Sequence, residues 1–215
     1  MTSTHRTKPK RTWKPLRRIS LQLMEWGVTS EMVALAGMVL GILAGVSFMA
    51  TGFNDEPMMF WILGMVCCIL RVGCIRLDVA LQPLSHKQSL EDIFFNELPE
   101  RVSDAVTLIG FGFAMDSSPW LGLGAALTAI FSAYVRSVGY SRGAGRKHAS
   151  SGPMTRIHRL VLISLTSILM IFGVNTNNLE NLNMTIPQIA LWVIIMGCVA
   201  TILIRWLNIR EFSES

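Results

Sequence analysis

Polar side chains that could hold a metal ion recur in one stretch of an otherwise apolar sequence. Asn96, Glu100 and Asp104 are spaced by four residues, so on a helix they share one face. Glu97 and Arg101 lie beside them in the sequence. Carboxylate and amide oxygens are ligands that suit Mg²⁺ and Mn²⁺, which makes this stretch a candidate metal site.

A second polar set lies on the preceding apolar segment. Arg71 and Asp78 are seven residues apart, which is two helical turns, so they also share a face. If the two helices pack side by side, one cavity collects four candidate metal ligands: Asp78, Asn96, Glu100 and Asp104. The alternative is a structural ion-pair cluster in which three arginines neutralise the acids: Arg71, Arg76 and Arg101.

The elements that must position these residues are membrane helices. Of 215 residues, 51% are hydrophobic and only 15% are charged, whereas a soluble domain carries about 25% charged residues. A spanning helix needs about 20 apolar residues, and six segments reach or approach this length: Met32–Phe53, Pro57–Leu81, Pro99–Met115, Trp120–Val138, Leu160–Val174 and Ile186–Leu207. We therefore expect an all-α integral membrane protein with six transmembrane helices. Gly37, Gly41 and Gly45 in the first segment indicate close helix packing.

Basic residues are concentrated in two segments and predict the orientation. Residues 1–30 hold seven Lys or Arg against one acid, and residues 136–159 hold six against none. The connections on the other side hold acids and no basic residue: Asp55, Glu56, Asp116 and Glu180. Because basic loops stay in the cytoplasm, we expect both termini there, together with the two polar segments at 76–98 and 136–159.

Residues 12–27 are expected to form an interfacial amphipathic helix. Trp13 and Leu23 lie near its apolar face, and most of its basic residues lie on the other, an arrangement that places cations beside anionic headgroups. We divide the chain into a basic N-terminal part, residues 1–30, and a membrane domain, residues 31–210. The attached spans make membrane lipids the expected partner of the basic part, and no nucleic acid is expected.

Three stretches resemble the CDP-alcohol phosphotransferases, the membrane enzymes that make phospholipid headgroups. GVTSEMVALAGMVLGILAG (27–45) is similar to the family's opening turn and its first helix, which is rich in small residues. FNELPERVSDAVTLIG (95–110) and YVRSVGYSRGAGRKHASSGPMTRIHR (134–159) are similar to a divergent bacterial branch. The resemblance covers most of the chain, and the stretch at 95–110 is its most specific part.

The family motif, D-x-x-D-G-x-x-A-R, eight residues, then G-x-x-x-D-x-x-x-D, aligns with residues 75–100 without a gap. Asp78 falls on its second Asp, Asn96 on its third and Glu100 on its last. The resemblance implies that Asp78 is a metal ligand and Asn96 a weaker one. It implies that Glu100 is a ligand or the base that takes the acceptor's proton. Asp104, one turn beyond the motif, could supply a missing ligand.

Other motif positions depart from the family. Ile75 replaces the first Asp and cannot bind a metal. Val79 and Gln82 replace small residues where the family packs its backbone against the cytidine nucleotide, so they are expected to line the nucleotide site. Asp92 replaces a Gly and could act there as a substitute ligand. Pro83 replaces an Arg and is expected to end or bend the helix.

The basic segment before the fifth span has two interpretations. It is either a topology determinant whose charges contact headgroups, or an anion pocket for a phosphate on donor or acceptor. The pocket would be built from Arg136, Arg142, Arg156 and Arg159. His158 is expected to be a helix-start residue rather than an acid or base.

The resemblance implies a transferase of phospholipid biosynthesis. A substituted phosphate would pass from a CDP-linked lipid or alcohol to an acceptor hydroxyl, with release of CMP, in the presence of Mg²⁺ or Mn²⁺. A homodimer in the bacterial inner membrane is implied as well. The alternative is a catalytically inactive relative that binds lipid or regulates a partner enzyme. A transporter or channel is less favoured, because the polar groups cluster on one side of the membrane.

Overall fold

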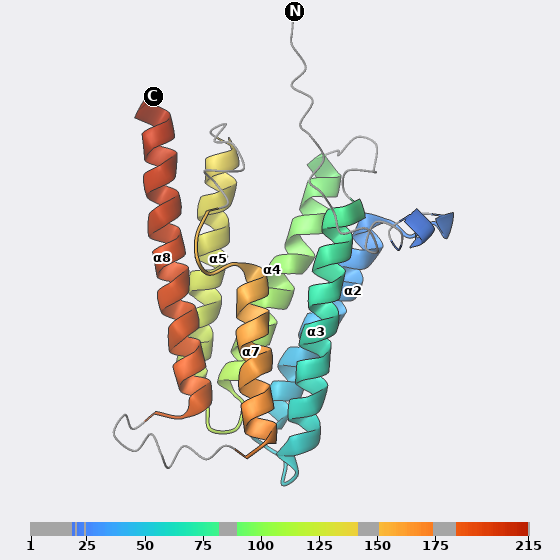
Figure 1. Cartoon of the computed structure of the whole chain (residues 1–215), viewed down its shortest axis with the longest axis vertical. Helices are drawn as coiled ribbons and strands as arrows, with labels where there is room; N and C mark the ends of the chain where they lie inside the picture. Colours follow the sequence, from blue (N-terminus) through green and yellow to red (C-terminus); the bar gives the residue numbers. More distant parts are fainter. Residues whose placement is uncertain are drawn as a thin grey trace, which may run out of the picture.

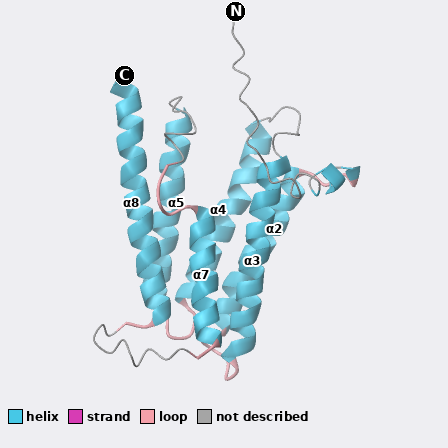
Figure 2. Cartoon of the chain, in the orientation of Figure 1, coloured by secondary structure: helices cyan, strands magenta, loops and turns pink. Residues whose placement is uncertain are grey.

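The computed structural model describes residues 19, 21–23, 25–81, 90–141, 151–173 and 184–214, with the side chains of α4 described from Glu97 onward. Six long helices make up this part (Figure 1): α2 (Ser30–Ala50), α3 (Pro57–Leu81), α4 (Leu90–Gly112), α5 (Pro119–Ser141), α7 (Arg156–Ile171) and α8 (Ile186–Glu214). Figure 2 shows only helices and loops among the described residues. The all-α expectation is confirmed for this part of the chain. Most of the expected interfacial helix at 12–27 lies outside it.

Four helices are long and apolar enough to cross a membrane, namely α2, α3, α5 and α8. The expectation of six spans is therefore not confirmed. Helix α7 has 16 residues, about 24 Å at 1.5 Å per residue, which is less than the roughly 30 Å hydrocarbon core. Helix α4 is not among these four, because it carries too many ionisable residues for a membrane-spanning helix. Four apolar helices in one chain nevertheless indicate a multi-pass membrane protein.

Two helices extend well beyond their predicted apolar runs: α4 begins before Pro99, and α8 continues past Leu207 to Glu214. Helix α3 spans Pro57–Leu81, as expected. Helix α4 begins at Leu90 rather than at Pro99, which lies inside it. The apolar run underestimates α4 because its first turns are polar, and the helix continues through Pro99 although an interior proline is unfavourable.

Helices α2 and α4 approach each other so closely that glycine is required at the contact. A Cβ built on Gly110 would lie 2.1 Å from the carbonyl oxygen of Gly45, and one on Gly41 would lie 2.9 Å from the Cβ of Ser103. These atoms belong to backbone or to a short, buried side chain, so they cannot move aside. The close packing expected at Gly41 and Gly45 is confirmed, and it fixes the position of α4 against α2.

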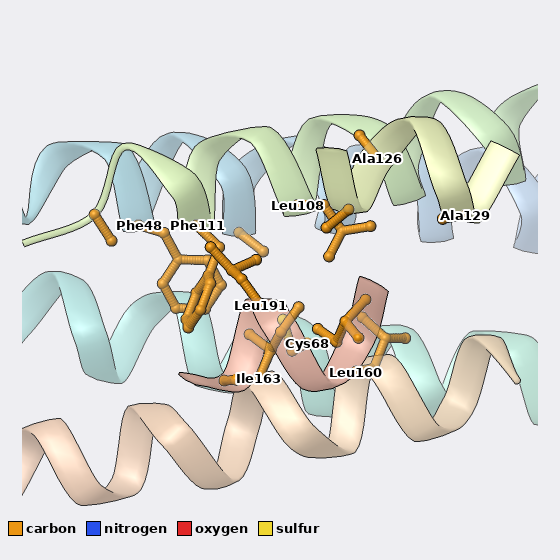
Figure 3. Packing of buried hydrophobic residues seen from close by; sticks show 14 of the residues in the cluster. Phe48, Cys68, Leu108, Phe111, Ala126, Ala129, Leu160, Ile163 and Leu191 are labelled. Atoms are coloured by element: carbon orange, nitrogen blue, oxygen red, sulfur yellow. The ribbon is translucent and has the colours of Figure 1, made fainter. Parts of the chain in front are cut away.

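An aromatic cluster fills the end of the molecule where α2 and α4 finish and α3 begins. The rings of Phe48 and Phe111 meet edge to face with centroids 5.2 Å apart, and Trp61 packs against both. Figure 3 shows Phe48 and Phe111 beside Leu191 of α8 in the apolar core. All three rings are buried. The described polar residues of α3 and α4 therefore lie toward the opposite end of these helices.

Candidate active site at the polar ends of the helices

A cavity of about 430 Å³ lies among α3, α4, α5, α7 and α8. Its walls include three carboxylates, on Asp78, Glu97 and Glu100. They also include five guanidinium groups, on Arg101, Arg136, Arg156, Arg159 and Arg205. With five cations against three anions, the described lining carries a net positive charge and suits an anionic ligand.

Asp104 lies at the centre of a buried ion-pair cluster. Its Oδ1 is 2.5 Å from Arg71 of α3, and its Oδ2 is 2.6 Å from Arg159 of α7. Arg156 Nε lies 3.7 Å from the same Oδ2. The side chains of Arg71, Asp104 and Arg159 are all at least nine-tenths buried, so each charge depends on its partner. The contacts of Asp104 correspond to the ion-pair cluster given above as the alternative to a metal site. Of the arginines named there, Arg71 takes part and Arg101 does not, and Arg159 joins instead.

Arg71 also joins the cluster to the contact between α2 and α4. Its Nη1 donates to Thr107 Oγ1 at 3.3 Å, and the Thr107 hydroxyl donates in turn to the carbonyl oxygen of Gly41 at 3.0 Å. The guanidinium thus bridges α3, α4 and, through Thr107, α2. Because these bonds are buried, they hold α3 and α4 in one register and bring the faces that carry Asp78 and Glu100 together.

Glu100, the last carboxylate of the motif, forms an ion pair with Arg156 at the start of α7. Both residues line the main cavity and a small side pocket beside Arg71. Asp78 of α3 lines the same two spaces. Of the four residues expected in one cavity, Asp78 and Glu100 line it from neighbouring helices, and Asp104 is not in its lining.

Asp78 is buried, and the Ser30 hydroxyl at the first position of α2 donates to its Oδ1. Ser30 follows Thr29, whose side chain caps α2 by accepting from the backbone N–H of Met32. The start of α2 is thus fixed both by its own cap and by the carboxylate of α3. This contact holds Asp78 at the edge of the cavity.

Glu97 forms weaker ion pairs at the outer part of the cavity. Arg101, one turn along the same helix, lies 3.2 Å from it, and Arg136 of α5 lies 3.8 Å away. The Glu97 side chain is 44% exposed. Exposed pairs of this kind contribute little to stability, about 0–1 kcal/mol.

Arg205 of α8 is a site residue that the sequence analysis did not select. It is buried and donates to the carbonyl oxygens of Ser132 and Ser151 at 2.6 and 2.8 Å. Among the described residues it forms no ion pair with a carboxylate, and its side chain lines the cavity. The sequence does contain a signal for it: Arg205 is a charged residue within the predicted span Ile186–Leu207, and such residues usually indicate a functional site.

The segment before α7 is fastened to α8. The backbone N–H of Met154 donates to Thr201 Oγ1 at 3.0 Å, and Asn208 donates to Ser151 Oγ at 2.8 Å. Gly152 has φ +134°, and a Cβ there would lie 2.4 Å from Thr201. His158 lies in the first turn of α7, and its Nδ1 lies 2.7 Å from the carbonyl oxygen of Pro153 and 3.4 Å from the backbone nitrogen of Thr155. His158 therefore acts as a helix-start residue, and this whole segment positions Arg156 and Arg159.

A divalent ion has only part of a ligand set among the described residues. No group of three or more His, Cys, Asp or Glu that could hold a metal lies in the part of the chain that the structure describes. Both oxygens of Asp104 contact arginines, so we do not propose it as a ligand. Asp78 and Glu100 remain. Mg²⁺ is often bound by one or two carboxylates together with substrate phosphates, so this pair fits an ion that a phosphate ligand helps to hold.

Several predicted site positions lie outside the described side chains: Gln82, Asp92, Asn96 and Arg142. Val79 is described, is 48% exposed and lines the cavity. Arg136, Arg156 and Arg159 line it as well. Three of the four predicted phosphate-binding arginines thus lie around one cavity.

Comparison with known proteins gives a match in structure only. No family model matches the chain, and no curated protein sequence matches it. Solved structures of the Mycobacterium tuberculosis phosphatidylinositol phosphate synthase are similar to it. The manganese and citrate complex has TM-score 0.66 at 15% identity, covering 90% of this chain and 88% of that one. The complex with CDP-DAG has TM-score 0.66 at 13% identity, covering 92% and 94%.

These TM-scores and coverages define the fold class of the chain. The chain is a multi-pass helical membrane protein, and it shares over nearly its whole length the fold of a phosphatidylinositol phosphate synthase. At such low identity the likeness establishes the fold, and the activity has to be argued from the residues of the cavity.

Proposed function

We propose that this protein is a CDP-alcohol phosphotransferase of phospholipid biosynthesis. It transfers a substituted phosphate from a CDP-linked lipid or alcohol to an acceptor hydroxyl and releases CMP. The observation that carries the proposal is the placement of Asp78 and Glu100, two motif positions, on one arginine-lined cavity. The fold supports it, since a synthase of the same fold has been solved with CDP-DAG bound.

The donor's diphosphate binds where the cavity is most basic. Arg156 lines both the main cavity and the side pocket, and its planar guanidinium can bind phosphate oxygens in pairs. Val79 lies beside Asp78 on the cavity wall and contacts the nucleotide, together with Gln82 and Asp92. The lipid part of the donor lies along the apolar outer faces of the helices, where side chains such as Leu127 and Met196 are exposed.

A divalent cation, Mg²⁺ or Mn²⁺, would be held by Asp78 and Glu100, with Asn96 as a weaker ligand. A manganese complex of the structural neighbour is consistent with this assignment. When bound, such an ion withdraws charge from the phosphoryl oxygens and so stabilises the transition state. Asp104 is not among the ligands, and its part is to hold Arg71 and Arg159 in place.

The chemical step is a displacement at the phosphorus next to the alcohol or lipid group. The acceptor oxygen forms a new P–O bond, the bond between that phosphorus and the oxygen of CMP breaks, and CMP leaves with the electron pair. Glu100 takes the proton of the acceptor hydroxyl.

The acceptor side of the cavity is formed by α5, α7 and α8. Arg136, Arg159 and Arg205 lie on these helices and line the cavity, and Arg142 follows α5 in the sequence. This group binds a phosphate carried by the acceptor or the donor. Such an arrangement gives more specificity than a single cation, because several fixed guanidinium groups must match one anion.

The cellular setting follows from the charges and the family resemblance. We place the protein in the bacterial inner membrane as a homodimer, with both termini in the cytoplasm beside membrane lipids. The basic residues of 1–30 and 136–159 support this orientation. The cavity then opens toward the side on which soluble nucleotides are found.

The direct test is CMP release by the purified protein in lipid nanodiscs. CDP-diacylglycerol and Mg²⁺ are supplied with a panel of acceptors, with and without a phosphate group, and CMP is measured by chromatography. We expect acceptor-dependent CMP release that requires the divalent ion. Absence of release across the panel, from protein shown to be folded, would overturn the proposed function.

A further inference from the structure

The ion pair between Glu100 and Arg156 places a cation against one of the two carboxylates that remain as metal ligands. We infer that Arg156 and a divalent cation compete for Glu100, so that the cation binds only after a nucleotide diphosphate has drawn Arg156 away. The inference rests on the proposed function, and it adds an order of binding and a role for a residue that the family motif does not contain.

Arg156 can leave Glu100 without losing all of its charge partners. Its Nη1 contacts Glu100, while its Nε lies 3.7 Å from Asp104. The side chain is 13% exposed on the cavity. A buried cation that lost its only partner would be strongly unfavourable. Because Asp104 remains beside it, Arg156 can turn from a carboxylate of the protein to a phosphate of the ligand.

The free protein offers a divalent cation little besides Glu100 and Asp78. No third His, Cys, Asp or Glu completes a group around them within the described residues. Asp78 also accepts from the Ser30 hydroxyl. A second cation placed on Glu100 would be repelled by the guanidinium of Arg156, since like charges at close quarters disfavour each other.

A diphosphate would change both the position of Arg156 on Glu100 and the shortage of oxygen ligands for the cation. It supplies anionic oxygens that the guanidinium of Arg156 can bind in place of Glu100. It also supplies the extra oxygen ligands that Mg²⁺ and Mn²⁺ take from substrate phosphates. The cavity of about 430 Å³ has room for such a group next to Arg156 and Asp78. Nucleotide and cation should therefore strengthen each other's binding by the same factor, as linkage requires.

The test measures Mn²⁺ binding by the loss of the free-ion signal in electron paramagnetic resonance, with the full chain in detergent. Titrations are made with no nucleotide, with CDP and with CMP, and Mn²⁺ bound by each nucleotide in protein-free buffer is subtracted. We expect CDP to tighten Mn²⁺ binding by at least about tenfold, within the range typical of coupled sites. CMP, which lacks the diphosphate, should have a much smaller effect.

Two variants separate competition at Glu100 from a general change of charge. Arg156→Met removes the competing cation, so we expect Mn²⁺ to bind without nucleotide at least about tenfold more tightly than to the wild type. Arg101→Met removes the same charge from the same cavity, but Arg101 pairs with Glu97. This control should change Mn²⁺ binding far less. A thermal unfolding curve for each variant confirms that it is folded.

The outcomes are distinct. Tight Mn²⁺ binding by the wild type without nucleotide would overturn the inference and leave the proposed function standing. Equal gains in Arg156→Met and Arg101→Met would also overturn it, because the effect would then be one of net charge. If the wild type bound neither CDP nor Mn²⁺ in any combination, both the inference and the proposed function would fail. The wild-type titrations decide the matter even if a variant does not fold.

Discussion

Arg159 on α7 lies 2.6 Å from Asp104 on α4, although 55 residues separate them in the sequence. The other oxygen of the same carboxylate lies 2.5 Å from Arg71 on α3. One buried acid therefore ties together three helices that each contribute a wall of the candidate site. This relationship explains how α4 carries the charge of Asp104 and still packs inside the bundle.

Replacing Asp104 with Asn should destabilise the fold. The substitution leaves two buried arginines without their anion, and breaking a buried pair in this way costs about 3–5 kcal/mol. The measurement is the free energy or midpoint of unfolding in detergent. Glu97→Gln, the same change on the same helix in an exposed pair, should cost less than about 1 kcal/mol. Equal losses in the two variants would contradict the role given to Asp104.

Replacing Glu100 with Gln should remove activity and leave the fold intact. The amide cannot accept the acceptor's proton, and loss of a general base slows a reaction about 10²–10⁴-fold. CMP release is compared with that of Glu97→Gln, which removes the neighbouring carboxylate of the same cavity. Comparable rates in the two variants would show that Glu100 is not the base.

Replacing Gly110 with Ala should separate α2 from α4. The added Cβ would meet the backbone of Gly45 at 2.1 Å, and overpacking of this kind costs about 1–3 kcal/mol. Gly73→Ala on α3 is the matched control, because a Cβ there meets nothing within 4 Å. That control should gain up to about 1 kcal/mol from its higher helix propensity. If both variants unfolded alike, the close contact of α2 and α4 would be wrong.

Replacing Arg205 with Met should loosen the segment before α7. The substitution removes the bonds to Ser132 and Ser151, so the backbone N–H of Met154 should exchange with solvent faster than in the wild type. Hydrogen exchange with mass spectrometry measures this directly. Arg210→Met, an exposed arginine on the same helix, should leave the exchange of that segment unchanged, and an equal increase there would argue against the role of Arg205.

The sequence predicts the helices well because hydrophobic length is a local property. Pro57–Leu81 matches α3, and the two-turn spacing of Arg71 and Asp78 places both on one face of it. The number of six spans is not confirmed, because α4 and the short α7 do not have the length and composition of a spanning helix. Local apolarity does not reveal how much of the membrane thickness a helix crosses.

The ion-pair partners of the charged residues could not be predicted from local sequence patterns. Asp104 looked like a substitute metal ligand because it continues the spacing of Asn96 and Glu100. Its true neighbours, Arg71 and Arg159, come from distant parts of the chain. Only the packing of α3 and α7 on α4 brings them together. Arg205 differs from the basic loop residues, because it is a single charge within the apolar run at 186–207.

The central claim is that a nucleotide diphosphate binds in the cavity between Asp78 and Arg156. The most direct measurement is an experimental structure of the protein with CDP and Mn²⁺. The account predicts that the diphosphate contacts Arg156, and that the ion lies on Asp78 and Glu100. Nucleotide density outside this cavity, or an empty cavity with Arg156 still on Glu100 at saturating ligand, would contradict it.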